Sequence, residues 1–68
     1  MFMIDYVVVE EADSNANYKV YLSSVANVTE FKNNTFTIIF DNGRTLLARA
    51  DFNTYSKIVG FLLKKKGE

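Results

Sequence analysis

The chain has 68 residues and a formal net charge of zero, and it contains no His, Cys, Trp or Pro. A chain of this length buries only about 60% of its unfolded surface on folding, so we expect one domain, residues 1–68, with one small core. The absence of Cys excludes disulfides and thiolate chemistry, and the absence of His removes the commonest general base and metal ligand.

Charge is distributed unevenly. Residues 1–30 carry five acids and one base, a net −4, and residues 31–68 carry seven bases and three acids, a net +4. Such a dipole can orient a partner or a second copy of the chain, but it is not the basic excess of a dedicated nucleic-acid binder. The N-terminus lacks a basic leader, and no apolar run approaches the ~20 residues that span a bilayer. We therefore expect a cytoplasmic protein without a membrane partner.

The first predicted strand covers Phe2–Glu10 and is apolar on both faces. This pattern is typical of an interior strand, or of a strand whose second face is covered from outside the fold. The polar segment Glu11–Asn17 follows as a loop, and its scattered acids lack the ligand spacing of a calcium site, so we predict no metal there. The two faces of the strand consist of Ile4, Tyr6 and Val8 on one side and Met3, Val7 and Val9 on the other.

The next segments alternate between extended and turn patterns. Tyr18–Leu22 predicts a second strand, which the pair Ser23-Ser24 interrupts. Val25–Phe31 is extended again, either as a third strand after a bend or as the far half of one long kinked strand. Lys32–Asn34 predicts a turn, because adjacent Asn residues tolerate left-handed backbone conformations.

Thr35–Ala50 predicts a β-hairpin around a turn at residues 41–43. A two-residue turn would pair Phe36 with Arg49 and place a charge on the aromatic face. We expect a three-residue loop with Gly43 in the left-handed conformation, because that register makes one face uniformly apolar. This face consists of Phe36, Ile38, Phe40, Leu46, Ala48 and Ala50.

Asp51–Lys66 switches to helical spacing, with Asp51 as the N-cap and Gly67 as the C-cap. Its apolar residues fall within a stripe of roughly 140°, which we expect to cover the apolar face of the hairpin. The predicted fold is α+β, an antiparallel β-meander of four or five strands with one C-terminal amphipathic helix packed on one face. The stripe consists of Phe52, Tyr55, Ile58, Val59, Leu62 and Leu63.

The second face of the sheet is the first candidate protein interface. One helix cannot cover both faces, and an uncovered apolar face in a soluble protein is typical of an interface. The alternative is that the sheet curls into a partial barrel and buries this face itself. We favour self-association or a protein partner. The apolar residues expected on this face are Ile39, Leu47, Val7 and Val9.

Phe61 is the second candidate. It lies outside the helical stripe, between Lys57 and Lys65, which are one turn away on either side. An aromatic anchor with a polar rim is typical of a protein contact. The alternative is that loop 11–17 or the N-terminus covers it. The nearby Gly60 indicates either close backbone contact or a glycine that the helix tolerates at a cost of about 1 kcal/mol.

Nucleic-acid binding is the competing function. Lys64, Lys65 and Lys66 at the end of the helix could contact phosphates, with Arg44 and Arg49 extending the patch along the hairpin. A solvated helix end explains the lysines equally well.

The segment NVTEFKNNTFTIIFDNGRTLLAR, and more loosely the span Val25–Leu63, resembles in pattern the later part of a LytTR-type DNA-binding domain. In that family, short strands joined by Asn and Asp-Gly turns lead into a Leu-rich helix. The downstream strands and basic recognition loops of the family have no counterpart in this sequence, so the resemblance assigns no binding residues.

The sequence carries no catalytic signature. Glu10, Glu11 and Asp13 cluster in a polar loop that offers little burial to separate their pKa values, and Ser23-Ser24 has no His base. We expect no enzyme, no cofactor and no small-molecule substrate. The composition favours a non-catalytic protein-binding module. Its partner is either another copy of the chain, giving a homodimer or larger homo-oligomer, or a cellular protein. Small accessory or inhibitory proteins of phages and mobile elements are of this kind.

Overall fold

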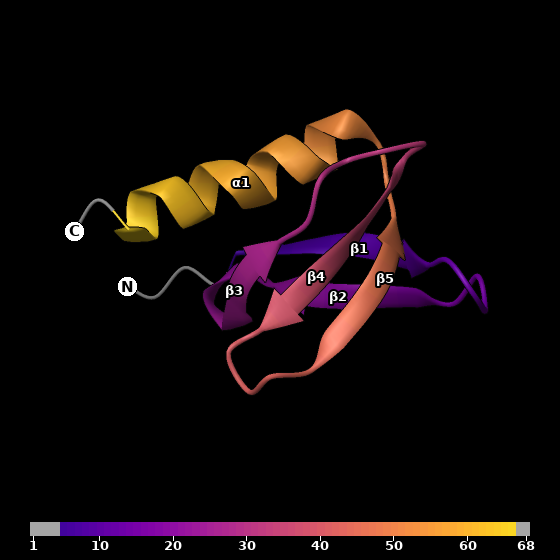
Figure 1. Cartoon of the computed structure of the whole chain (residues 1–68), viewed down its shortest axis with the longest axis horizontal. Helices are drawn as coiled ribbons and strands as arrows, with labels where there is room; N and C mark the ends of the chain where they lie inside the picture. The colour runs from indigo at the N-terminus through magenta and orange to yellow at the C-terminus, as the bar shows by residue number, and fades with distance from the viewer. Residues whose placement is uncertain (1–4, 67–68) are drawn as a thin grey trace.

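The computed structural model describes residues 5–66, which form one antiparallel five-stranded sheet and one C-terminal helix (Figure 1). The predicted α+β class is confirmed. Phe2–Ile4 of the predicted first strand and the predicted C-cap Gly67 lie outside the described residues. The elements are β1 (Tyr6–Glu11), β2 (Asn17–Tyr21), a 3-10 turn (Leu22–Ser24), β3 (Val25–Val28), β4 (Thr35–Phe40), β5 (Thr45–Arg49) and α1 (Phe52–Lys66).

The β4–β5 hairpin has the predicted register. Phe36 pairs with Ala48 and Ile38 pairs with Leu46, as the three-residue loop requires. Gly43 adopts a φ of 86°, which is the left-handed conformation that glycine accepts without steric cost. The apolar face of the hairpin is therefore directed to one side of the sheet.

Two other local predictions, the Asn33-Asn34 turn and the Asp51 cap, are also confirmed. Asn33 and Asn34 have φ values of 53° and 61°, so both adopt the left-handed conformation predicted for the turn before β4. Asp51 caps α1, because its Oδ1 accepts a hydrogen bond of 2.8 Å from the backbone N–H of Thr54. This bond, together with one from the Thr54 hydroxyl, lowers the pKa of the Asp51 carboxyl because both favour its ionised form.

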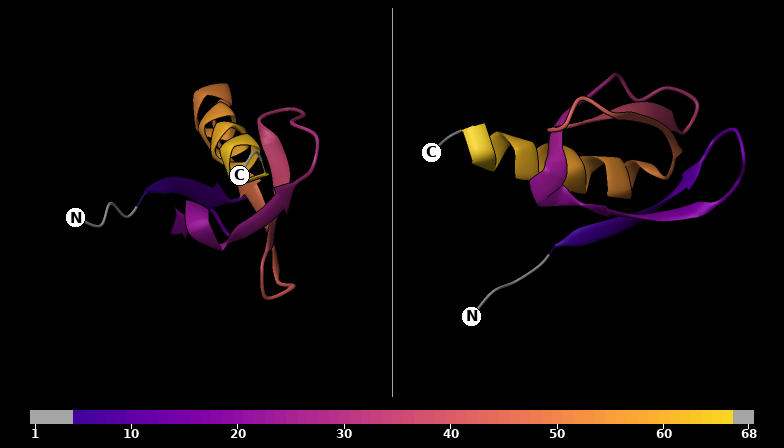
Figure 2. Two further views of the ribbon diagram at one scale, coloured as in Figure 1. Left: turned by 90° about the vertical axis from the view of Figure 1, so that its left-hand side faces the viewer. Right: turned by 90° about the horizontal axis from the view of Figure 1, so that it is seen from below.

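The strand order forces the sheet to coil. The order is β2-β1-β5-β4-β3, so the two strands that flank the 3-10 turn lie at opposite edges of the sheet. A flat sheet of five strands is roughly 19 Å wide, whereas a three-residue 3-10 turn rises only about 6 Å. The edges must therefore approach each other at the turn. Figure 2 shows the chain curving from β2 through this turn into β3, which lies beside α1.

The concave side of this coiled sheet holds the core, and α1 closes it. Val7 and Val9, only 7% and 2% exposed, belong to this core, so their predicted place on an exposed second face is wrong. Because Glu11 pairs with Ala48, the odd-numbered residues of β1 share the buried face of the hairpin. The core consists of Val7, Val9, Val20, Leu22, Val25, Phe36, Ile38, Ala48, Ile58 and Leu62.

The helix is rotated relative to the predicted stripe. Ile58 and Leu62 are buried as predicted, but Phe52 and Leu63 are exposed. Phe61 is half-buried and packs against the core, so its prediction as an exposed aromatic is wrong. The reason is that β3 packs against α1 on this side, since Lys65, one turn from Phe61, donates a hydrogen bond to the carbonyl oxygen of Val25.

Two aromatic contacts fix the start of the helix. The Tyr55 ring lies 5.0 Å from the rings of both Phe31 and Phe36, measured between centroids. The Tyr55 hydroxyl also donates a hydrogen bond of 3.3 Å to the carbonyl oxygen of Thr29. Across residues 5–66, no helix has the length and hydrophobicity needed to cross a membrane.

The orientation of α1 can be tested by replacing each of two adjacent leucines, Leu62 and Leu63, with alanine. Leu62 is 6% exposed and Leu63 is 67% exposed. Leu62→Ala should lower the free energy of unfolding by about 2–5 kcal/mol, and Leu63→Ala should change it by no more than about 0.5 kcal/mol. Urea denaturation followed by circular dichroism measures both. Equal effects would contradict this orientation.

Gly60 and Gly43 form a second matched pair. A Cβ atom at Gly60 would meet no atom within 4 Å outside its own stretch of helix. Among the described residues there is thus no close backbone contact, and the alternative of a tolerated glycine holds. Gly60→Ala should stabilise the protein by about 0.5–1 kcal/mol, because Ala favours the helix. Gly43→Ala should destabilise it by about 1 kcal/mol, because Gly43 has a positive φ. Thermal unfolding of both variants checks the two signs.

Candidate functional site

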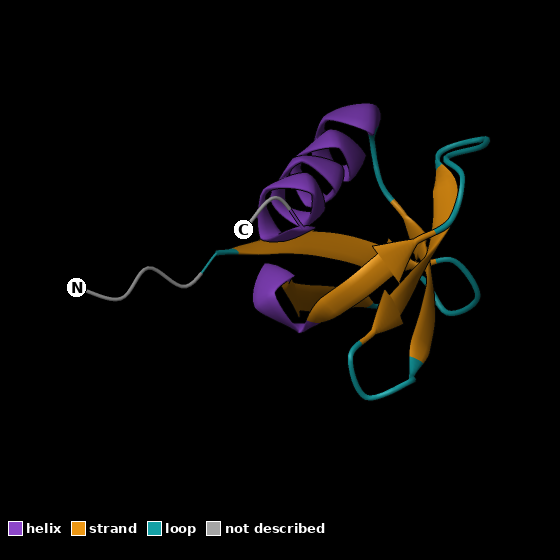
Figure 3. Cartoon of the chain, turned by 60° about the vertical axis from the view of Figure 1, so that its left-hand side comes forward, coloured by secondary structure: helices purple, strands orange, loops and turns teal. Residues whose placement is uncertain are grey.

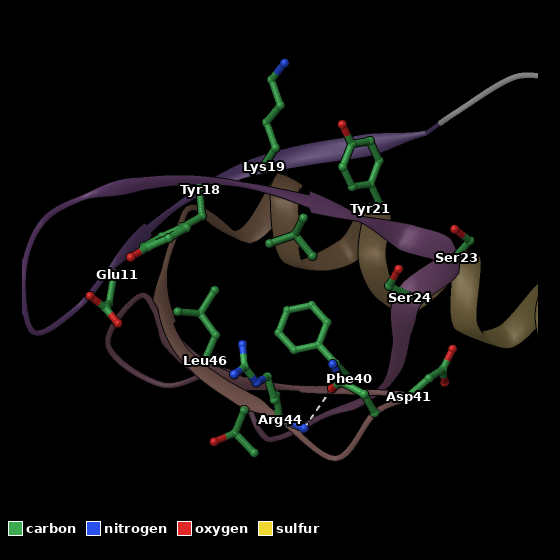
Figure 4. A pocket seen from close by; sticks show the side chains of 13 residues that line it. Glu11, Tyr18, Lys19, Tyr21, Ser23, Ser24, Phe40, Asp41, Arg44 and Leu46 are labelled. Atoms are coloured by element: carbon green, nitrogen blue, oxygen red, sulfur yellow. Dashed lines mark hydrogen bonds between the residues drawn. The ribbon is translucent and has the colours of Figure 1, made fainter.

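A cavity of about 610 Å³ opens between β2, the 3-10 turn and the end of the β4–β5 hairpin. We call this opening the barrel mouth. Figure 4 looks into it, with the strands arranged around the cavity and α1 behind them. Its volume lies within the range of about 300–1,000 Å³ that is typical of ligand-binding pockets.

The inner surface of the barrel mouth is apolar. It is formed by Tyr18 and Val20 of β2, Phe40 of β4 and Leu46 of β5. Figure 4 shows that Tyr18, Phe40 and Leu46 point into the cavity. Val20 is buried in the core, whereas Phe40 and Leu46 are half-buried, so the cavity is an extension of the core toward solvent.

The four charged residues that line the barrel mouth differ in their partners. Within residues 5–66, Arg44 forms no ion pair, and its guanidinium projects toward the cavity in Figure 4. The other three are engaged within the fold. They are Glu11, which accepts a hydrogen bond from Ser14 Oγ, Lys19, whose Nζ lies 5.1 Å from the centroid of the Tyr6 ring, and Asp41, whose Oδ2 lies 3.6 Å from Lys65 Nζ.

The barrel mouth also borders the backbone of β2. Four consecutive residues, 18–21, line the cavity. Successive side chains of a strand point to opposite faces, so a cavity that touches four in a row lies along the edge of the strand. Figure 4 agrees, because Lys19 and Tyr21 point away from the cavity. β2 is an edge strand of the sheet, so no other strand within residues 5–66 pairs with this backbone edge.

The predicted interface residues do not form one surface. Leu47 is exposed and Ile39 is half-buried on the convex face of the β4–β5 hairpin, whereas Val7 and Val9 are inside the core. Lys57 is exposed on α1. Their role in protein binding therefore stays a prediction only for the residues outside the core.

The two predicted interface residues at the end of α1, Phe61 and Lys65, contact the rest of the fold. Phe61 packs against the core, and Lys65 Nζ donates hydrogen bonds of 3.5 Å to the carbonyl oxygens of Ser23 and Val25. Lys65 also pairs with Asp41. These contacts engage Lys65 with the rest of the fold rather than leaving it free for a partner.

The residues predicted to bind nucleic acid are also dispersed. Arg49 Nη1 lies 3.0 Å from Glu10 Oε1 and 3.1 Å from Asn15 Oδ1, so its charge is compensated. Arg44 directly precedes β5 and Arg49 ends it, so the two are roughly 17 Å apart along the extended backbone. Lys64 is exposed on α1, and the side chain of Lys66 lies outside the described residues. Nucleic-acid binding stays a prediction, and this geometry adds no observation in its favour.

No family model matches the chain, and the searches of curated proteins and of solved structures found no match either. The LytTR-like pattern therefore gains no support. Over residues 5–66, no three His, Cys, Asp or Glu side chains gather in a way that could hold a metal ion. The barrel mouth offers an apolar surface, a strand edge and a guanidinium, which are groups suited to binding.

Sequence reasoning placed Phe40 and Leu46 on one face of the hairpin but did not bring Val20 of β2 to them. The signal that could have done so was the alternative of one long kinked strand across Ser23-Ser24. That kink brings β2 opposite the β4–β5 hairpin and creates the cavity between them. Tyr18, whose ring lines the cavity, was predicted only as part of an alternating strand.

The barrel mouth should bind a small probe with an apolar body and one negative charge. Anilinonaphthalene sulfonate should gain fluorescence with the folded protein, and Leu46→Trp should reduce this gain by filling the cavity. Leu63→Ser, which removes exposed apolar surface from α1, is the matched control. Loss of fluorescence in the control but not in Leu46→Trp would place the apolar binding surface on the helix. Circular dichroism verifies that both variants are folded.

Proposed function

We propose that this protein is a non-catalytic protein-binding module and that it binds its partner at the barrel mouth. The observation that carries this proposal is the position of an unpaired strand edge beside an apolar cavity. Strand edges present rows of backbone donors and acceptors, and the backbone of another protein chain complements them directly. A small rigid ligand would use the cavity but not the edge.

The partner is either a cellular protein or a second copy of this chain. The barrel mouth has an aromatic ring, apolar side chains and a mixed charged rim, which is the composition of protein interfaces. The small size of the chain and its lack of catalytic groups support an accessory or inhibitory role in the cytoplasm, of the type encoded by phages and mobile elements.

Site-specific photo-crosslinking in the host cell tests the proposal. Tyr18 at the barrel mouth and Phe52 on α1 are both exposed aromatic residues, so benzoylphenylalanine can replace either with little change in shape. We expect a covalent protein adduct from position 18 and none from position 52. Mass spectrometry of the adduct distinguishes a second copy of the chain from a cellular protein.

The control position also decides the outcome. Adducts from position 52 alone would place the interface on the helix and overturn the assignment to the barrel mouth. The absence of a protein adduct from both positions would overturn the protein-binding function.

A further inference from the structure

We infer that the barrel mouth binds an extended segment of the partner, which adds to β2 as a sixth strand and carries an acidic side chain that pairs with Arg44. This inference rests on the proposed protein-binding function and specifies its mode. It depends on three observations: the direction of the β2 backbone groups, the difference between the two sheet edges, and the charges of the rim.

The hydrogen bonds of β1 and β2 identify the free backbone groups. The N–H of Leu22 donates 3.0 Å to the carbonyl oxygen of Asp5, and the N–H of Glu11 donates 2.7 Å to that of Ala16. In an antiparallel ladder, hydrogen-bonded pairs alternate with pairs that are not hydrogen-bonded. Leu22 and Ala16 are thus hydrogen-bonded to β1 at the two ends of β2. By alternation, the even-numbered residues between them, Tyr18 and Val20, are bonded to β1 as well. The N–H and C=O groups of Lys19 and Tyr21 must point to the open edge.

The two edges of the sheet are not equivalent. The β3 edge is covered by the fold itself, because α1 packs on it and Lys65 Nζ donates a hydrogen bond to the carbonyl oxygen of Val25. Natural proteins usually protect exposed edges with charges, prolines or bulges. β2 has one charge, on Lys19, and that side chain is held over the Tyr6 ring on the opposite side from the cavity. The open edge of β2 is therefore available for pairing.

An added strand would place its side chains in the cavity at every second position. Its residues beside Tyr18 and Val20 would point the same way as those two side chains, toward Phe40 and Leu46. Its other residues would point outward, beside Lys19. The bound segment should therefore have bulky apolar residues at alternate positions.

Charge complementarity selects one further feature of the segment. Of the charged groups that line the barrel mouth, Arg44 alone lacks a partner within residues 5–66, since Asp41, Glu11 and Lys19 are engaged. A guanidinium prefers a carboxylate, which it can bind with two parallel hydrogen bonds. The partner segment should supply an Asp or Glu near this position.

A phage-displayed library of random octapeptides provides the probe. Selection on the wild-type protein should enrich sequences with alternating apolar residues and one acidic residue. Selection on Arg44→Glu should enrich a basic residue in its place. Lys64→Glu makes an equal charge change at an exposed residue of α1 that does not line the barrel mouth, and it should select the wild-type pattern. Failure to enrich any peptide, or peptides without alternation, would overturn the inference.

Amide hydrogen exchange then tests the pairing itself. At ten times its Kd, the enriched peptide should slow exchange at the Lys19 and Tyr21 amides about tenfold, and should leave the Tyr18 and Val20 amides, already bonded to β1, much less affected. A peptide N-methylated at alternate residues should lose this protection. Binding without protection of Lys19 and Tyr21 would overturn strand addition.

These outcomes separate the inference from the function on which it rests. A crosslinked protein at position 18 with no enriched octapeptide would leave protein binding in place and reject strand addition. Protection of Lys19 and Tyr21 that rises with protein concentration in the absence of peptide would assign the edge to a second copy of this chain, and would overturn the choice of a separate partner segment.

Discussion

A connection of three residues between the two outermost strands determines the architecture of this protein. Leu22–Ser24 joins β2 and β3, which lie at opposite edges of the sheet, so the five strands must coil around a common core. Coiling gives the sheet a concave side that holds the apolar residues and a convex side that faces solvent. It also leaves the barrel mouth, because the edges meet only at the turn (Figure 3).

Local signals in the sequence predicted much of this fold. Gly43 and the Asn33-Asn34 pair were informative because a positive φ is allowed to few residue types, and the register of the β4–β5 hairpin followed from its apolar face. Asp51 was informative because helix capping depends on residues close in sequence. Physical constraints that act over two to five residues can be read without knowledge of the tertiary structure.

The buried face of β1 and the rotation of α1 could not be predicted in the same way. β1 has apolar residues on both faces, so only its pairing with β5, 37 residues or more along the chain, decides that Val7 and Val9 are inside. α1 has apolar residues around more than half of its circumference, and packing against β3 selects Phe61 in preference to Leu63. The cavity could not be predicted either, because it depends on how the sheet coils and brings β2 opposite the β4–β5 hairpin.

The seam between β1 and β5 has a consequence for the dynamics of the fold. β1 pairs with β2 over five positions, from Tyr6–Tyr21 to Glu10–Asn17, but with β5 only at Glu10–Arg49 and Glu11–Ala48. Both hairpins form from residues close in sequence, whereas this seam closes a long loop and is held by few bonds, so it is the place where partial unfolding should begin. Val7, Val9 and Val20 of the β1–β2 hairpin lie in the core, so the hairpin cannot move away as a whole without exposing them. Opening of the seam should therefore be confined to its Glu10–Glu11 end, where β1 meets β5.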